Sequence, residues 1–207
     1  MSDPKLKIII IDNTMNETEP LIVELRLTFK DSNIILRKNA TDGLQYIMDN
    51  LNSKMIVLLD YDLGAGEPTG TDIFLQIREK TALLYVIIIT AKLIDEVPNK
   101  ELAAYINKDA LAFVDKTVSV KDRINIVKNA VHSLDTKVDC ILEQWIYNHS
   151  EKEQNEPYLT TSSGKTHSLL SILEEIRQRT DFGKTIERNI LLLAVDLLTR
   201  GKKQIND

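Results

Sequence analysis

Short runs of isoleucine, valine and leucine recur along the first two-thirds of the chain, separated by longer amphipathic stretches. The runs lie at Leu6–Ile11, Ile34–Leu36, Met55–Leu59, Tyr85–Ile89 and Ala112–Val114. Three of them are nearly continuous in apolar residues, which is typical of strands buried on both faces of a parallel sheet. Helical periodicity between the runs favours helices near Glu17–Lys30, Thr41–Asn50, Asp72–Lys80 and Glu96–Asn107. The pattern predicts an α/β fold whose five-stranded parallel sheet is doubly wound.

Length and composition exclude several classes of protein. The 207 residues suffice for one or two domains with a buried core, and one cysteine, Cys140, excludes an intramolecular disulfide framework. No apolar stretch approaches the ~20 residues of a membrane span, and the first residues do not resemble a signal peptide. A net charge of −5 argues against nonspecific nucleic-acid binding. We therefore expect a soluble, cytoplasmic protein that has neither a membrane nor DNA as a partner.

Polar side chains follow four of the predicted strands, where each strand ends: Asp12, Asp60, Thr90 and Lys116. In a doubly wound sheet, ligands bind in the crevice outside the carboxyl ends of the strands. Two carboxylates, a hydroxyl and an ammonium suit a divalent cation together with a phosphoryl group. One of the carboxylates could act as a nucleophile and form an aspartyl phosphate.

The stretches that carry these residues are recognisable together: IIIIDN at 8–13, VLLDYDLG at 57–64, GTDIFLQIR at 70–78, VIIITAK at 86–92 and AFVDKT at 112–117. In this order they resemble the receiver domains of bacterial two-component response regulators, the CheY-like family, over about residues 5–134. The resemblance implies a flavodoxin/CheY-like fold. It also implies that Asp60 accepts a phosphoryl group from a sensor histidine kinase or a phosphotransfer protein.

The resemblance implies further roles for matching residues. Asp12 and Asp60 would hold Mg²⁺, with a weaker contribution from Asn13 and with the backbone carbonyl of Asp62. Lys116 would contact the phosphoryl group. Thr90 and Phe113 would form the switch pair that responds to phosphorylation.

Three positions depart from the family pattern. Asn13 stands where a second acidic residue is usual, so one negative charge is missing from the metal site. The loop from Asp60 to Gly70 is about two residues longer than usual and carries its proline at Pro68. The family's Lys-Pro pair, usually joined by a cis peptide bond, is Lys116-Thr117 here. These departures leave open a receiver that takes no phosphate and serves as a docking or dimerisation scaffold.

Two charges flank the predicted site. Asp62 follows Asp60 by two residues, and Lys92 follows Thr90 by two. They could form an ion pair across the mouth of the site that shields an acyl phosphate from water. Alternatively, both are solvated surface charges.

The stretch from Ser119 to about Ser150 contains neither glycine nor proline and predicts one long helix. Its apolar residues repeat at coiled-coil spacing: Ile124, Val127, Val131, Leu134, Val138, Ile141 and Trp145. We expect a receiver domain over 1–134 and a coiled-coil-like extension of its last helix over 135–150. The apolar stripe of that extension could be buried in an intrachain bundle or in a homodimer.

The remaining chain predicts a linker over 151–165 and an all-helical hairpin over 166–207, with helices at Thr166–Thr180 and Phe182–Thr199 and a turn at 181–183. Gly164-Lys165-Thr166 lacks the first glycine of a P-loop, and His167 lacks the flanking residues of a phosphoacceptor histidine. No catalytic effector is recognisable, so we expect no enzyme. The predicted output is dimerisation or protein–protein interaction by the helical part, the alternative being transcription control through DNA binding.

Overall fold

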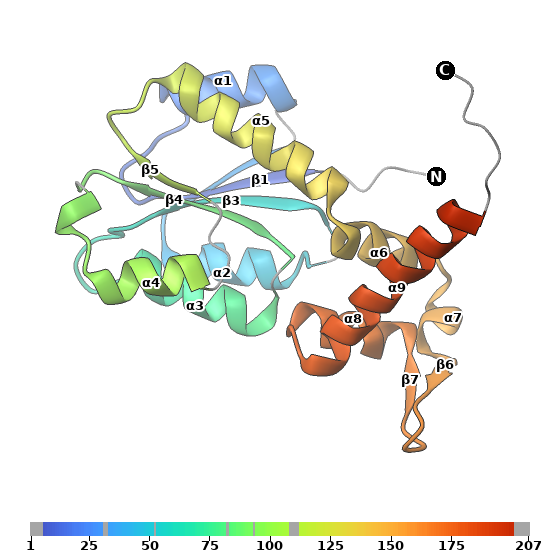
Figure 1. The fold of residues 1–207 in the computed structure, drawn as a ribbon. Helices are drawn as coiled ribbons and strands as arrows, with labels where there is room; N and C mark the ends of the chain where they lie inside the picture. Colours follow the sequence, from blue (N-terminus) through green and yellow to red (C-terminus); the bar gives the residue numbers. More distant parts are fainter. Residues whose placement is uncertain are drawn as a thin grey trace.

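The structure is a computed structural model that describes residues 6–30, 33–51, 53–81, 83–92, 94–107 and 112–200. Its first part contains a five-stranded parallel sheet in the order β2-β1-β3-β4-β5 (Figure 1). The strands are β1 Lys7–Ile11, β2 Ile34–Arg37, β3 Met55–Asp60, β4 Tyr85–Thr90 and β5 Ala112–Asp115. This architecture confirms the predicted doubly wound fold, and each strand lies within two residues of its predicted bounds.

Helices cover both faces of the sheet, as Figure 1 shows. One layer consists of α1 Pro20–Phe29 and α5 Val120–Thr136, and the other of α2 Ala40–Met48, α3 Gly70–Lys80 and α4 Asn99–Asn107. Because successive side chains of a strand point to opposite faces, Ile8 and Ile10 pack under the first layer and Ile9 and Ile11 under the second. A 3₁₀ turn, η2 Ile94–Glu96, precedes α4.

The loop between β3 and α3 is fixed at its far end, although it is longer than the family pattern. Thr69 caps α3 through a reciprocal pair of hydrogen bonds with Asp72. The amide of Gly70 donates to the carbonyl of Tyr61 at 2.9 Å. A Cβ atom at Gly70 would lie 2.3 Å from the carbonyl oxygen of Asp60, so this close approach requires glycine. The loop therefore returns directly to the residues around Asp60.

The prediction of one long helix from Ser119 to Ser150 is wrong, because the structure has two separate helices there. Lys137 adopts an extended conformation (φ −73°, ψ 129°) that ends α5 and begins a separate helix, α6 Val138–Tyr147. The break lets two helices pack on different partners, α5 on the sheet and α6 largely on the C-terminal helices. It also rotates the buried face: Cys140 and Ile146 point inward, and the predicted stripe residues Ile141 and Trp145 are exposed. A continuous coiled-coil extension over 135–150 is thus not formed.

The prediction of a linker over 151–165 is also wrong, because this segment has secondary structure. It contains a short helix, α7 Glu151–Asn155, with a capping box between Ser150 and Glu153. An antiparallel hairpin follows, made of β6 Pro157–Thr160 and β7 Thr166–Ser168. The two expected helices are α8 Leu169–Arg177 and α9 Asp181–Arg200. Their turn lies at 178–180, where Arg179 has a positive φ of 53°, and residues 201–207 lie outside the described ranges.

The C-terminal module, residues 138–200, packs at the edge of the sheet where the strands begin (Figure 1). Leu83, just before β4, joins the apolar cluster of the module. The guanidinium of Arg177 donates to the carbonyl of Leu51 at 2.7 Å, and the side-chain amide of Gln178 donates to the carbonyl of Lys80 at 3.2 Å. The module therefore lies opposite the edge to which the predicted site residues belong. No helix among the described residues is long and apolar enough to cross a membrane.

Candidate functional site

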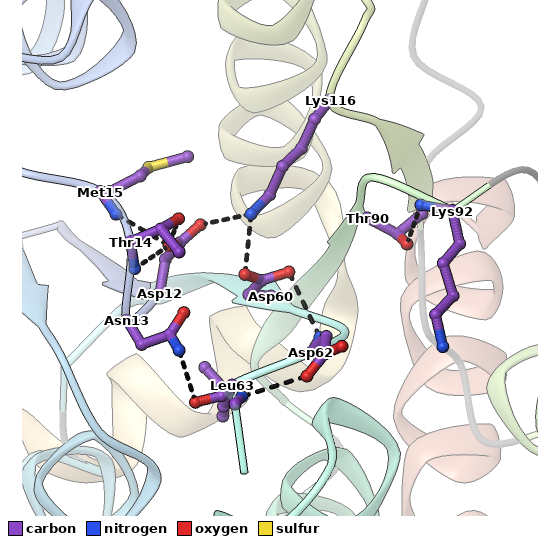
Figure 2. A network of polar contacts seen from close by, with 11 residues as sticks. Asp12, Asn13, Thr14, Met15, Asp60, Asp62, Leu63, Thr90, Lys92 and Lys116 are labelled. Atoms are coloured by element: carbon purple, nitrogen blue, oxygen red, sulfur yellow. Dashed lines mark hydrogen bonds and ion pairs between the residues drawn. The ribbon is translucent and has the colours of Figure 1, made fainter.

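The structure brings the predicted charged residues together where the strands end. Asp12 follows β1, Asp60 is the last residue of β3 and Lys116 follows β5. The ammonium of Lys116 donates to Asp60 Oδ2 at 2.7 Å and to Asp12 Oδ2 at 2.9 Å, so that it bridges the two carboxylates (Figure 2). Both carboxylates are almost fully buried. The charge of Lys116 compensates for placing two acidic groups side by side.

The other oxygen of Asp12 is held by the turn that follows β1. Its Oδ1 accepts hydrogen bonds from the amide and hydroxyl of Thr14 and from the amide of Met15, at 2.7 to 2.9 Å. Burial alone would raise the pKa of Asp12, but the hydrogen bonds from Lys116, Thr14 and Met15 outweigh it and hold the pKa below its usual value. Asp12 is therefore a fixed, ionised group.

Asp60 has the opposite balance. Burial raises the pKa of its carboxyl group, and although the hydrogen bond from Lys116 opposes this, the negative charge of Asp12 raises it further. Burial likewise disfavours the charged form of Lys116, but the two carboxylates outweigh burial and raise the pKa of the ammonium. Among the described residues, Asp60 Oδ1 accepts only the amide of Asp62, at 3.3 Å. This oxygen is the less tightly held one in the pair.

A pocket of about 330 Å³ opens beside these groups. The residues that line it are Asn13, Thr14, Asp60, Asp62, Gly64, Thr90, Ala91, Lys92 and Lys116. Asp60 thus lies at the wall of a polar cavity, with the ammonium of Lys116 and the hydroxyl side chain of Thr90 beside it. The space and the polarity suit a phosphoryl group.

Of the two predicted switch residues, Thr90 lines the pocket and Phe113 does not. Thr90 is buried, and its hydroxyl oxygen accepts the backbone amide of Lys92 at 2.9 Å. Phe113 on β5 does not line the pocket; its ring packs against Tyr105 of α4 at 6.0 Å between centroids. Phe113 therefore contacts the helix layer, and Thr90 contacts the pocket.

Asn13 provides an amide where the family pattern has a second acid. Its side-chain nitrogen donates to the carbonyl of Leu63 at 2.7 Å, and none of the described contacts engages its oxygen (Figure 2). With Asp12 and Asp60 it forms a set of hard oxygen donors, which fits Mg²⁺ that keeps several waters. In the described part of the chain, no three His, Cys, Asp or Glu residues are grouped so as to hold a metal ion. The fit therefore rests on two carboxylates and a neutral amide.

Asp62 and Lys92 do not form the ion pair considered from the sequence. The carboxylate of Asp62 accepts the amide of Gly64 at 3.1 Å, and the ammonium of Lys92 lies 4.8 Å from the centre of the Tyr61 ring. The aromatic face competes for the cation, so both residues are exposed at the pocket without meeting. No cis peptide bond occurs among the described residues, and Lys116 reaches both carboxylates with a trans bond to Thr117.

Sequence reasoning missed a polar cluster between α3 and α4. The hydroxyl of Thr71 on α3 hydrogen-bonds to Glu101 and, at 2.6 Å, to the hydroxyl of Tyr105. Tyr61, next to Asp60, also hydrogen-bonds to Glu101 through its hydroxyl. Glu101 and Tyr105 are four residues apart on the helix predicted over 96–107, but Tyr61 and Thr71 lie outside every strand and helix predicted from the sequence. No sequence signal therefore brought the four residues together.

The rejected motifs of the C-terminal part stay rejected. The Gly164-Lys165-Thr166 segment forms the tight turn and second strand of the β6–β7 hairpin, with the amide of Gly164 donating to Thr161. His167 is only 3% exposed and stacks on Phe182 at 4.3 Å between ring centroids. A phosphoacceptor histidine must be accessible, and this one is enclosed.

Comparisons with known proteins concern the fold. No protein-family model matches the chain, and no curated protein sequence matches it. Similar solved structures include NtrX from Brucella abortus in complex with ATP, at a TM-score of 0.53 and 15% identity over 75% of this chain and 31% of that one. The N-terminal domain of an uncharacterized protein from Wolinella succinogenes has a TM-score of 0.51 and 16% identity over 64% of this chain and 99% of that one. A CheY-like response regulator receiver domain protein from Methanospirillum hungatei has a TM-score of 0.49 and 20% identity, covering 62% of this chain and 95% of that one. The strand order 2-1-3-4-5 found here is the CheY-like one.

Proposed function

We propose that this chain, whose first domain has the CheY-like receiver fold, is a response regulator of a two-component system. Asp60 accepts a phosphoryl group from the phosphohistidine of a sensor histidine kinase or a phosphotransfer protein. The observation that carries this proposal is the ammonium of Lys116 held between Asp12 and Asp60 at the wall of a polar pocket. We place the reaction in the cytoplasm, in keeping with a chain whose single cysteine cannot form an intramolecular disulfide.

In the proposed step, a carboxylate oxygen of Asp60 attacks the phosphorus atom. The new P–O bond forms as the P–N bond to the donor histidine breaks, and the electron pair of that bond returns to the imidazole. Asp60 Oδ1 is suited to be the nucleophile because Lys116 holds Oδ2. Lys116 and the hydroxyl of Thr90 then hydrogen-bond to the phosphoryl oxygens and stabilise their charge.

Mg²⁺ belongs to this proposal as a cofactor. Asp12 and Asp60 would hold it, with the side-chain oxygen of Asn13 and the backbone carbonyl of Asp62. When bound, the ion supplies positive charge that offsets the repulsion between the incoming phosphoryl oxygens and the two carboxylates. Because Asn13 is neutral, the site holds the cation more weakly than three acidic residues would.

The switch follows from what Thr90 and Phe113 contact. If the hydroxyl of Thr90 turns to the phosphoryl group, it gives up the amide of Lys92. Movement of the loop that follows β4 alters the space beside Phe113, whose ring packs on Tyr105 of α4. Phosphorylation of Asp60 thereby changes the surface formed by α4 and β5.

For the output we propose protein–protein interaction and self-association by the C-terminal module, and no enzymatic activity. Residues 151–207 contain nine basic and nine acidic residues, a balance that does not favour DNA binding. The module instead exposes apolar side chains, chiefly on α9. Such surfaces are typical of interaction sites.

The test is phosphorylation by acetyl phosphate in the presence of Mg²⁺, followed by mass spectrometry of the intact protein. We expect one added phosphoryl group on the unmodified protein and none on Asp60→Asn. Asp62→Asn is the matched control: it makes the same change two residues away, at a carboxylate that Lys116 does not contact, and should keep the modification. No modification of the unmodified protein by acetyl phosphate, and no binding of beryllofluoride, would favour the docking scaffold instead.

A further inference from the structure

Among the described residues, no other element covers the second half of α9. From Leu191 to Leu198 the sequence is LLLAVDLL, with Asp196 as its one charged residue. Six large apolar side chains of this segment, the α9 arm, are exposed by 48% to 79%: Leu191, Leu192, Leu193, Val195, Leu197 and Leu198. At 100° per residue they point in all directions around the helix axis. A helix that is apolar on every side is normally enclosed by other elements.

An apolar groove of about 520 Å³ lies at the base of this arm, where α6, β6 and α8 meet α9. Ile141 and Trp145 of α6, Tyr158 of β6 and Ile190 of α9 contribute to its lining. Asn189 is the one polar residue among those that line it. The break at Lys137 turned Ile141 and Trp145 outward, so the groove owes its open side to that break.

The arm and the groove form one continuous surface. Leu193 belongs to both, and Leu197 lies one turn further along the same side of α9. A two-fold symmetric dimer needs a surface that is complementary to itself, which means a ridge and a groove on the same face. The C-terminal module has this combination: a projecting apolar helix next to an apolar groove of matching character.

The extent of the surface also matches a dimer. Nine of the eleven large apolar side chains that are exposed in the described residues belong to the C-terminal module. Covering nine such side chains removes several hundred Å² of apolar surface. A standard protein–protein interface buries about 800 Å² per partner. A second copy of the chain can supply that cover in one symmetric contact.

We propose that the occupant of the groove is the α9 arm of a second copy, and that the arms of two chains exchange in this way. The inference rests on the proposed self-association of the module and specifies its surface, the ridge at Leu197 and Leu198 against the groove at Ile141 and Trp145. It does not depend on phosphorylation of Asp60, which lies at the opposite edge of the sheet.

The experiment compares the full chain with Leu197→Glu/Leu198→Glu. Both side chains are already exposed, so the change does not disturb the fold of one chain. Leu27→Glu on α1 is the matched control, because Leu27 is 78% exposed and Leu198 is 79% exposed. Light scattering at micromolar concentrations measures the mass, and the fluorescence of Trp145, the one tryptophan of the chain, reports on the groove.

We expect the mass of two chains for the unmodified protein and for Leu27→Glu, and of one chain for the arm variant. Emission of Trp145 should shift to longer wavelength in the arm variant, as the groove becomes solvated. A monomeric unmodified protein overturns the proposal, and so does its capture by phosphatidylcholine vesicles, which identifies a lipid as the occupant. A dimer that survives the arm substitutions, or that dissociates without a change at Trp145, overturns the assignment of arm to groove. Asp60→Asn measured in parallel should remain a dimer, so failure of phosphorylation and failure of this interface are distinguishable.

Discussion

The α/β domain, residues 6–136, and the C-terminal module differ in how completely they bury their apolar residues. In the described part of the α/β domain only Val23 and Leu27 are large, apolar and exposed, whereas the module exposes nine such side chains. A sheet between two helix layers buries its central strands, as Ile8–Ile11 of β1 and Met55–Asp60 of β3 show. The module has one small cluster around Leu173 and Ile176, and half of α9 extends beyond it. The α/β domain therefore covers nearly all of its own large apolar side chains, and the module leaves part of α9 exposed.

The largest loss of stability that we predict comes from weakening the contact between the module and the α/β domain. Arg177 is buried, forms an ion pair with the partly buried Glu143 and donates to the carbonyl of Leu51, so Arg177→Ala removes both contacts. We expect a loss of about 3–5 kcal/mol in the free energy of unfolding, measured in urea. Lys152→Ala, which removes the exposed pair with Glu156, should cost less than about 0.5 kcal/mol. Equal losses in the two variants would contradict a docking role for Arg177.

Two glycines allow the same change in each region. A Cβ atom would lie 2.3 Å from the carbonyl of Asp60 at Gly70, and 2.3 Å from the carbonyl of Glu175 at Gly183. Substitution by alanine should destabilise the affected region by about 1–3 kcal/mol, as measured by hydrogen exchange. Gly70→Ala should also slow phosphorylation by acetyl phosphate, because it displaces Asp60, whereas Gly183→Ala should not. Equal phosphorylation rates in the two variants would contradict the prediction that only Gly70→Ala displaces Asp60.

A substitution at Asn13 can add a second acidic residue next to Asp12, where the sequence has a neutral amide. Asn13→Asp places a carboxylate beside Asp12 and Asp60, and that carboxylate can no longer donate to Leu63. We expect Mg²⁺ to bind roughly tenfold more tightly, which corresponds to about 1.4 kcal/mol, and phosphorylation to become faster. Isothermal titration and acetyl phosphate kinetics measure the two effects. Asn16→Asp, an exposed change on the same loop, is the control and should leave the affinity for Mg²⁺ unchanged.

The smallest effect concerns acid sensitivity of the module. The hydrogen bond from Thr180 lowers the pKa of Glu175, an effect that burial opposes and the charge of Lys165 supports. A carboxyl group with a lowered pKa adds stability above its unfolded pKa, and that stability is lost as the pH falls through its folded pKa. Thr180→Val removes this bond to Glu175 and also the hydrogen bond that Gly183 donates to the hydroxyl. Stability should fall by about 0.5–1 kcal/mol at neutral pH, and the difference should shrink in acid to the part that the lost Gly183 contact causes. Thr180→Ser keeps the hydroxyl and should follow the unmodified protein in a pH series of thermal unfolding.

How far the sequence predicts each region follows from the same contrast. Strands such as Met55–Asp60 are buried on both faces, so their apolar runs identify them without knowledge of neighbours. Asp12, Asp60 and Lys116 were predictable as a cluster because parallel strands end at one edge. These are properties that a segment carries by itself.

The predictions that were wrong concern segments whose conformation depends on the residues they pack against. Lys137 breaks a stretch that is helical by periodicity, because the residues before and after it pack on different bodies. The α7 helix and the β6–β7 hairpin are short, polar and held by local caps such as Ser150 with Glu153, so they resemble a linker. Lys92 lies over Tyr61 and not beside Asp62, a choice between two partners that spacing alone does not decide.

The position of the module has a consequence for access. Its contacts at Leu51, Lys80 and Leu83 lie where the strands begin, and none of its described residues lines the Asp60 pocket at the other edge of the sheet. A histidine-bearing donor domain can approach Asp60 without displacing the module. In the dimer proposed through α9, each chain would keep its own Asp60 pocket, away from the shared surface. If Asp60 is phosphorylated as proposed, the two chains would be modified in separate donor encounters, and half-modified and fully modified dimers would be distinct species.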